Sequence, residues 1–138
     1  MYMATKRNDN ENLHEEYPEL RQMTYNNPGY DYIFKNIFGL FVLIEHKYRS
    51  KGIKFDITPT QEALADIFSL RTHDDMHYHM SKDNYLKLAK PHSALASGWK
   101  GKSKELAQKT FIENATTDLH EVANKIKHNH ATLEDFMS

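Results

Sequence analysis

The stretch Tyr30–Ser50 constrains the fold most, because its apolar residues recur every three or four positions. This spacing places them on one face of an α-helix. The residues with this spacing are Phe34, Ile37, Phe38, Phe41, Ile44 and Tyr48. Leu40, Val42 and Leu43 widen the apolar surface beyond that face. The pattern therefore predicts a long helix at the centre of the core, enclosed on more than one side.

A second helix is predicted to begin at Thr58. Pro59 follows at the first helical position and Gln61 lies three residues after Thr58, which is the arrangement of a capping box. The preceding residues Ile53–Ile57 alternate between apolar and polar, as in a short strand or an extended connector. A shorter helix is expected at Pro18–Met23, where proline occupies the first turn.

The remaining segments are also predicted to be mainly helical. Thr72 can cap a helix over His73–Met80, and Ser81 can cap a further helix or continue the same one, which ends before Pro91. A loop with Trp99 is expected at residues 91–102. A last helix is expected from Ser103 to about Asn129, with a possible break at residues 114–118, where Thr and Asp compete for cap geometry.

These expectations define an all-α fold with at most one short strand or hairpin. A chain of 138 residues is long enough for one domain with a substantial hydrophobic core and too short for two domains that each have such a core. The predicted organisation is a flexible N-terminus at residues 1–16, a single helical domain at 17–130 and a C-terminal tail at 131–138.

The composition excludes several classes of function. The chain has no cysteine, which excludes disulfides, thiolate catalysis and cysteine-based zinc fingers and suits a cytoplasmic protein. The longest apolar run, Ile37–Ile44, is far shorter than the roughly 20 residues of a membrane span, and the N-terminus has no secretory signal pattern. The net charge is −1, although lysine exceeds acid over residues 76–130.

The order of a long helix, a short connector and the stretch Thr60-Gln61-Glu62-Ala63-Leu64-Ala65-Asp66-Ile67 resembles the helix-turn-helix and winged-helix DNA-binding regulators. The resemblance covers residues 38–90. It implies a positioning helix at this stretch, a following helix in the major groove and phosphate contacts near the start of the positioning helix.

The residues expected at a nucleic-acid interface follow from this resemblance and from the lysines downstream. A glycine–lysine loop beside Trp99 adds donors that could approach phosphate. The predicted interface consists of Thr60, Gln61, Arg71, Thr72, His73, His77, Lys82, Lys87, Lys100, Lys102 and Lys104.

Two patterns suggest metal chemistry as a third hypothesis. On a helix, His73 and His77 would share one face at the spacing of a zincin motif, with Asp74 where that family has glutamate. In addition, His46, the His73–Asp74 dyad and Asp118 follow the order of ligands in the HD phosphohydrolases, which they resemble. The first pattern lacks a third ligand and the second rests on residue order alone, so no metal, cofactor or catalytic residue is predicted.

The sequence therefore favours a small non-enzymatic accessory or regulatory protein that binds nucleic acid through a helix-turn-helix-like element. The alternative is a helical adaptor or inhibitor that binds a protein partner or a second copy of itself without nucleic-acid contact. A metal-dependent hydrolase built on the His73/His77 cluster is third. No membrane partner is expected.

Overall fold

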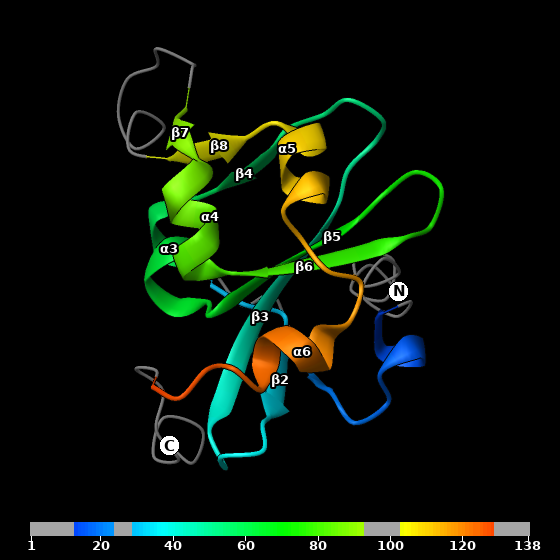
Figure 1. Cartoon of the computed structure of the whole chain (residues 1–138), viewed down its shortest axis with the longest axis vertical. Coiled ribbons are helices and arrows are strands. Elements are labelled where there is room, and N and C mark those ends of the chain that lie inside the picture. The colour runs from blue at the N-terminus through cyan, green and yellow to red at the C-terminus, as the bar shows by residue number, and fades with distance from the viewer. Residues whose placement is uncertain (1–12, 24–28, 93–102, 129–138) are drawn as a thin grey trace.

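The computed structural model describes residues 13–23, 29–92 and 103–128 (Figure 1). The N-terminal and C-terminal predictions for residues 1–12 and 131–138, and most of the loop with Trp99, lie outside these ranges. Residues 13–16 form a helical turn. The elements that follow it are β1 (Arg21–Gln22), β2 (Tyr32–Lys35), β3 (Phe41–Tyr48), β4 (Phe55–Ile57), α3 (Pro59–Leu64), β5 (Ile67–Arg71), β6 (His77–Ser81), α4 (Lys82–Leu88), β7 (Lys90–Pro91), β8 (Lys104–Leu106), α5 (Gln108–Glu113) and α6 (Leu119–Ala123).

The strand β3 occupies the centre of a five-stranded sheet with the order β1-β2-β3-β5-β6. Neighbouring strands are antiparallel except β3 and β5, which are parallel. A parallel pair needs a crossover connection, and here β4 and α3 lie within it. The strand β4 joins a second, antiparallel sheet with the order β4-β8-β7.

The predicted all-α fold is wrong, and the segment Tyr30–Ser50 shows the reason. It forms β2, a turn and β3 instead of a helix. The strand is buried on both faces from Val42 to His46, and such a strand has a nearly continuous apolar run, as an enclosed helix does. Gly39 lies in the turn with a φ of 79°, which glycine adopts readily.

Several other predicted helices are also wrong. A turn and β1 replace the short helix at Pro18–Met23, and the segment His73–Met80 forms a turn and β6. The helix expected from Ser103 to Asn129 is instead β8, α5 and α6. The predicted break at residues 114–118 is confirmed, since α5 ends and α6 begins there.

The predicted helix start at Thr58 is confirmed in detail. The Thr58 hydroxyl accepts from the Gln61 backbone N–H, and the Gln61 side chain accepts from the Thr58 N–H, so the capping box is complete. The short strand before it is confirmed as β4. Ser81 is confirmed as the N-cap of α4.

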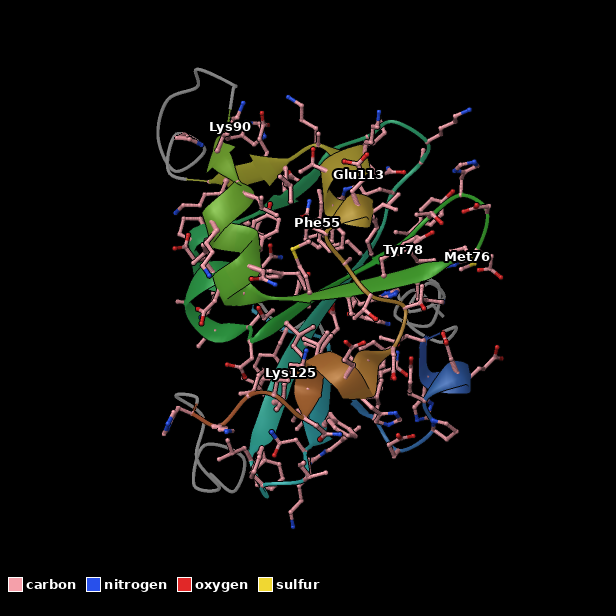
Figure 2. All side chains as sticks on the ribbon, viewed as in Figure 1. Phe55, Met76, Tyr78, Lys90, Glu113 and Lys125 are labelled. Atoms are coloured by element: carbon pink, nitrogen blue, oxygen red, sulfur yellow. The ribbon has the colours of Figure 1, made fainter. Side chains whose placement is uncertain are left out.

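Two apolar cores lie on opposite faces of the five-stranded sheet. The N-terminal core packs residues 13–20 and α6 against the sheet, and it contains Leu13, Tyr17, Leu20, Tyr32, Phe34, Val42, Ile44, Ile67, Leu119 and Ala123. The second-sheet core lies under β4, β8, α4 and α5, and it contains Phe55, Ile57, Ala65, Phe68, Leu70, Met80, Tyr85, Leu106 and Phe111. Figure 2 shows Phe55 between the two sheets. Within the described residues, no helix has the length and apolar character needed to cross a membrane.

Candidate functional site

The N-terminal core contains a set of buried histidines that meet through strand register. In the sheet, His46 of β3 is paired with Ser69 of β5, and Ser69 is paired with His79 of β6. These side chains therefore form one row across three strands, and His77 lies two residues before His79 on the same face. We call His46, Ser69, His77 and His79 the histidine cluster.

Two close contacts join the members of this cluster. The Ser69 Oγ lies 2.7 Å from the His79 Nδ1. The His46 Nε2 lies 3.3 Å from the His77 Nδ1, and the two rings are stacked with centroids 5.3 Å apart. The covering side chain is Tyr17, whose ring meets the His79 ring edge-on at 5.9 Å.

Burial keeps these imidazoles neutral. It lowers the pKa of His79 to about 3, with the neighbouring His77 acting in the same direction. Burial also lowers the pKa of His46 well below its ordinary value, again reinforced by His77. For His77 burial lowers the pKa, and Asp75 only partly opposes it. A neutral imidazole beside a serine hydroxyl resembles a nucleophile and its base. Both residues are fully buried, and His79 is among the residues that line a pocket.

In contrast to the buried histidine cluster, the turn between β2 and β3 exposes large apolar side chains. Ile37 is 72% exposed and Phe38 is 50% exposed. We call residues 36–40 the hairpin tip; it lies at the lower end of the molecule in Figure 1.

A buried asparagine fixes the shape of the hairpin tip. The Asn36 Oδ1 accepts from the backbone N–H groups of Phe38 and Leu40, each at 3.0 Å. Its Nδ2 donates to the carbonyl oxygens of Ala123 at 2.9 Å and Ile126 at 2.8 Å. The tip is thus tied both to itself and to the chain at the end of α6.

Two further contacts link the hairpin tip to the same C-terminal segment. The Ile37 N–H donates to the Asn124 Oδ1 at 3.0 Å. The Lys127 Nζ lies 5.8 Å from the centre of the Phe38 ring, within the range of a cation–π contact. The hairpin tip and the segment at the end of α6 therefore form one surface.

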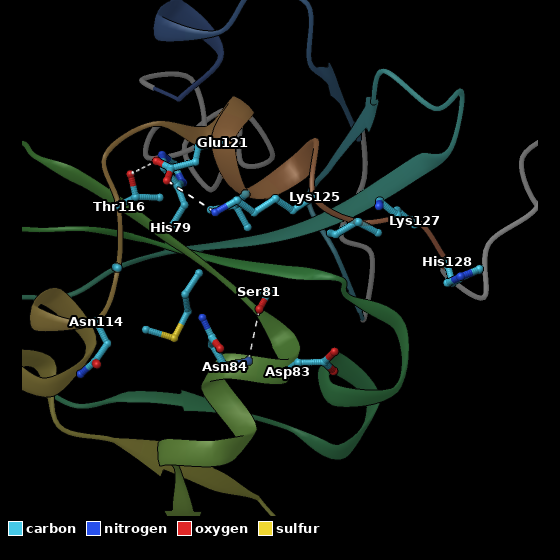
Figure 3. Close-up of a pocket in the computed structure, with 14 residues that line it drawn as sticks. His79, Ser81, Asp83, Asn84, Asn114, Thr116, Glu121, Lys125, Lys127 and His128 are labelled. Carbon is cyan, nitrogen blue, oxygen red and sulfur yellow. Dashed lines mark hydrogen bonds and ion pairs between the residues drawn. The ribbon is translucent and has the colours of Figure 1, made fainter.

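A pocket of about 690 Å³ adjoins this surface (Figure 3). Lys127 belongs to both, since it lines the pocket and lies over Phe38. Asp83 and Asn84 of α4 lie on one side of the pocket and Glu121 and Lys125 on the other, so its walls carry charges of both signs. The Lys125 Nζ and Glu121 Oε2 lie 3.7 Å apart.

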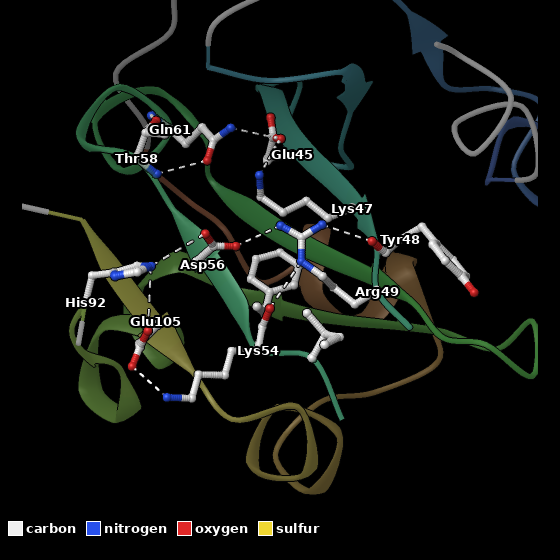
Figure 4. A network of polar contacts seen from close by, with 12 residues as sticks. Glu45, Lys47, Tyr48, Arg49, Lys54, Asp56, Thr58, Gln61, His92 and Glu105 are labelled. Carbon is white, nitrogen blue, oxygen red and sulfur yellow. Dashed lines mark hydrogen bonds and ion pairs between the residues drawn. The ribbon is translucent and has the colours of Figure 1, made fainter. Parts of the chain in front are cut away.

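On the other face of the sheet, a polar network surrounds Glu45 (Figure 4). The Gln61 Nε2 donates to the Glu45 Oε2 at 3.2 Å, and the Lys47 Nζ lies 3.4 Å from the same oxygen. Burial, followed by the charge of Asp31, raises the pKa of Glu45 to about 8. Nearby, Arg49 and Asp56 form an ion pair at 2.7 Å that ties β3 to β4.

Most residues predicted for a nucleic-acid interface have internal partners here. His77 and Thr72 are buried, and Gln61 bonds to Thr58 and Glu45. Arg71 lies 2.8 Å from Asp75 and also faces the Tyr48 ring.

Two lysines of that predicted interface also contact the protein itself. Lys82 donates to the Glu62 carbonyl and Lys104 pairs with the Glu62 carboxylate. Thr60, His73 and Lys87 are exposed on α3, the β5–β6 turn and α4 respectively. Lys100 and Lys102 lie outside the described residues.

Of the residues considered for a metal site, only His46 and His77 are brought together, and each belongs to a different one of the two patterns. His73 and Asp74 lie in the turn before β6, His46 is buried in β3, and Asp118 caps α6. His73 and His77 share no helix face, because no helix forms there. Within residues 13–23, 29–92 and 103–128, no group of three or more His, Asp or Glu side chains is arranged to hold a metal ion.

The sequence did not reveal the hairpin tip, because Ile37 and Phe38 fitted the apolar stripe of the predicted helix. The signal that could have found the tip is Gly39 directly after them, beside the turn-forming Asn36. The histidine cluster had no such local signal, because its members meet only through strand pairing.

Comparison with models of protein families, with curated proteins and with solved structures found no match to this chain.

Proposed function

We propose that this protein is a non-enzymatic adaptor or inhibitor that binds a protein partner through the hairpin tip. The observation that carries the proposal is the exposure of Ile37 and Phe38, at 72% and 50%, on a turn whose backbone is fixed. Burying one such side chain in a partner contributes about 1.5–3 kcal/mol. Two adjacent ones can form the centre of an interface.

The rigidity of the tip supports a binding role. Asn36 satisfies two backbone donors within the turn and two carbonyl oxygens at the end of α6. A loop already held in its binding shape loses little conformational freedom when a partner docks. The Asn124 contact to the Ile37 N–H adds to this restraint.

The charges beside the tip indicate the chemistry of the partner. Lys35 and Lys127 are both exposed next to it, and neither forms an ion pair with another described residue. We therefore propose a partner with an apolar pocket for Ile37 and Phe38 and carboxylates at its rim, since charge complementarity assists association and selects partners.

The test is site-specific photo-crosslinking in cells that naturally contain the protein. A photoreactive amino acid replaces Phe38, and a matched variant carries it at Ile53. Ile53 is 52% exposed and follows β3, whereas the tip precedes that strand. We expect one discrete crosslinked protein from position 38 and none from position 53. Binding of the purified partner should weaken at least tenfold with Ile37→Asn plus Phe38→Asn and remain unchanged with Ile53→Asn.

Equal crosslinking from both positions would show non-specific capture and contradict the proposal. Loss of binding in the Ile53→Asn control would contradict it as well. If the crosslinked partner is a second copy of this chain, the tip is a homodimer interface, which sedimentation of the two asparagine variants would show.

Nucleic acid is the second candidate, favoured by the cation that lies over Phe38. The Lys127 Nζ lies 5.8 Å from the centre of the Phe38 ring, and an exposed aromatic ring beside a cation suits a stacked base of a single strand. The hypothesis predicts salt-sensitive binding to single-stranded DNA that weakens with Lys127→Glu. Absence of binding at low salt would remove it. A cytoplasmic location remains part of either proposal and rests on the lack of cysteine.

A further inference from the structure

The histidine cluster lies at the boundary between the sheet and the layer that covers it. That layer consists of residues 13–20, the connector at 114–118 and α6, and we call it the cover. The His79 backbone N–H donates to the Thr116 carbonyl at 2.8 Å, and its carbonyl accepts from the Thr116 N–H at 3.0 Å. Tyr17 links the parts of the cover, because its hydroxyl contacts the Thr117 carbonyl and the Leu119 N–H.

The buried space between the sheet and the cover is unsuited to positive charge. The His79 Nε2 is buried without a hydrogen-bond partner among the described residues, so a second N–H or a full charge there would be poorly solvated. His46 and His77 lie 3.3 Å apart, and two imidazolium groups at that distance repel each other.

Charged and titratable groups approach the cluster from each neighbouring element. The cover contributes Glu16, whose carboxylate lies 4.0 Å from the His77 Nε2, and Tyr17. From the cover also comes the His120 ring, which contacts Tyr17 at 5.3 Å and pairs with Glu19.

The sheet also contributes charged groups of both signs near the histidine cluster. Arg71 of β5 acts on His46 and His77, and Asp75 of the β5–β6 turn acts on His77. The Asp31 carboxylate accepts the His46 backbone N–H at 2.9 Å, and Tyr32 meets the His46 ring edge-on. Two carboxylates, those of Glu16 and Asp75, approach an imidazole of the cluster, and in both cases that imidazole is His77.

We propose that the histidine cluster is an acid-operated release device, in which protonation of His46 and His79 separates the cover from the five-stranded sheet. The second-sheet core stays folded during this step. The two cores are distinct groups of side chains on opposite faces of the sheet, so one can open without the other.

The direction of the pH dependence follows from the folded-state pKa values. Those of His46 and His79 lie below the ordinary histidine value of 6.5. Below pH 6.5 the open state therefore binds more protons than the closed state, and the closed state loses stability as the pH falls. Each histidine raises the opening equilibrium up to about tenfold per pH unit, so the two together raise it up to about 100-fold.

Hydrogen–deuterium exchange of the full chain between pH 7 and pH 5, corrected for the intrinsic exchange rate, tests the proposal. We expect peptides from residues 13–23 and 114–128 to lose protection, by about 10- to 100-fold per pH unit below 6.5, while α4 and α5 keep theirs. The variant His46→Gln plus His79→Gln should remove most of this pH dependence and leave only the part that comes from His77, whose pKa burial also lowers. The control His73→Gln, at an exposed turn residue, should retain it.

Three results would overturn the proposal. They are unchanged protection of the cover down to pH 5, an equal loss of protection in the cover and in α4, and undiminished acid sensitivity in the double variant. If the double variant does not fold, the exchange pattern of the native chain decides between local release and its absence.

Discussion

The two faces of the five-stranded sheet bury polar groups in different ways. On the N-terminal face, the histidine cluster holds neutral imidazoles that contact one another and one serine. On the second-sheet face, Glu45 is the centre of a network with Gln61, Lys47 and neighbouring ion pairs. A buried polar group is costly unless it is paired. Each face also keeps a polar atom buried without a hydrogen-bond partner among the described residues, the His79 Nε2 and the Glu45 Oε1, so the stability of both faces depends on the protonation of a buried side chain.

The pH dependences of the two faces have opposite signs. The folded-state pKa values of His46 and His79 are lowered, so their contribution to stability is present above pH 6.5 and decreases as the pH falls. The pKa of Glu45 is raised from 4.5 to about 8, so its contribution is present below pH 4.5 and decreases as the pH rises through 8. Lowering the pH therefore weakens the N-terminal face and keeps the stabilising contribution of Glu45 on the second-sheet face.

The largest expected effect comes from breaking the second-sheet core. Phe55 is fully buried and stacks on Phe111 with centroids 4.7 Å apart, and it also contacts Phe68 and Tyr85. Phe55→Ala should lower the free energy of unfolding by about 3–5 kcal/mol, measured by denaturant unfolding. A loss below about 1 kcal/mol would show that this core is not the main support of the fold.

The next effect concerns the serine of the histidine cluster. Ser69→Ala removes the partner of the His79 Nδ1 at 2.7 Å, and a buried polar atom left unpaired costs about 1–3 kcal/mol. Urea unfolding at pH 7.5 measures the loss. Adding His79→Leu to Ser69→Ala should recover part of it, because both polar partners are then gone; additive losses would contradict the pairing.

A smaller effect is expected from Glu45→Gln, which fixes the neutral form of this side chain. Below pH 4.5 the native side chain is neutral in both the folded and the unfolded state, so the substitution should change stability little there. Between pH 4.5 and pH 8 the folded state keeps a proton that the unfolded state has lost, because the pKa of Glu45 is raised to about 8, and the native chain should lose stability relative to the variant by at most about 1.4 kcal/mol per pH unit. Parallel stability curves for the two proteins would contradict the raised pKa.

The smallest effect is expected at the helix cap that supports the Glu45 network. Thr58→Ala removes the hydroxyl that accepts from the Gln61 N–H at 3.1 Å and should cost about 1 kcal/mol. Ser81→Ala removes the corresponding cap of α4 and is the matched control. Only Thr58→Ala should also shift the pH dependence of stability that comes from Glu45, since Gln61 contacts both Thr58 and Glu45.

The sequence by itself determined the local features of the fold. The capping box at Thr58, the cap at Ser81, the extended residues of β4 and the break at 114–118 all depend on neighbours within a few positions. Side chains that cap a helix bond to backbone groups two or three residues away. Their pattern is therefore visible without knowledge of the tertiary structure.

The tertiary structure decided the class of fold and the locations of the histidine cluster and the hairpin tip. The apolar spacing of Tyr30–Ser50 suits a helix, yet the segment becomes β2 and β3 because burial on both faces of a strand favours the same residues. His46, Ser69 and His79 meet only because β3, β5 and β6 pair in one register. Strand pairing joins residues that are distant in sequence, so no local pattern could have placed the histidine cluster. The hairpin tip had a local turn signal in Asn36 and Gly39, but only the folded structure shows that Ile37 and Phe38 stay exposed there.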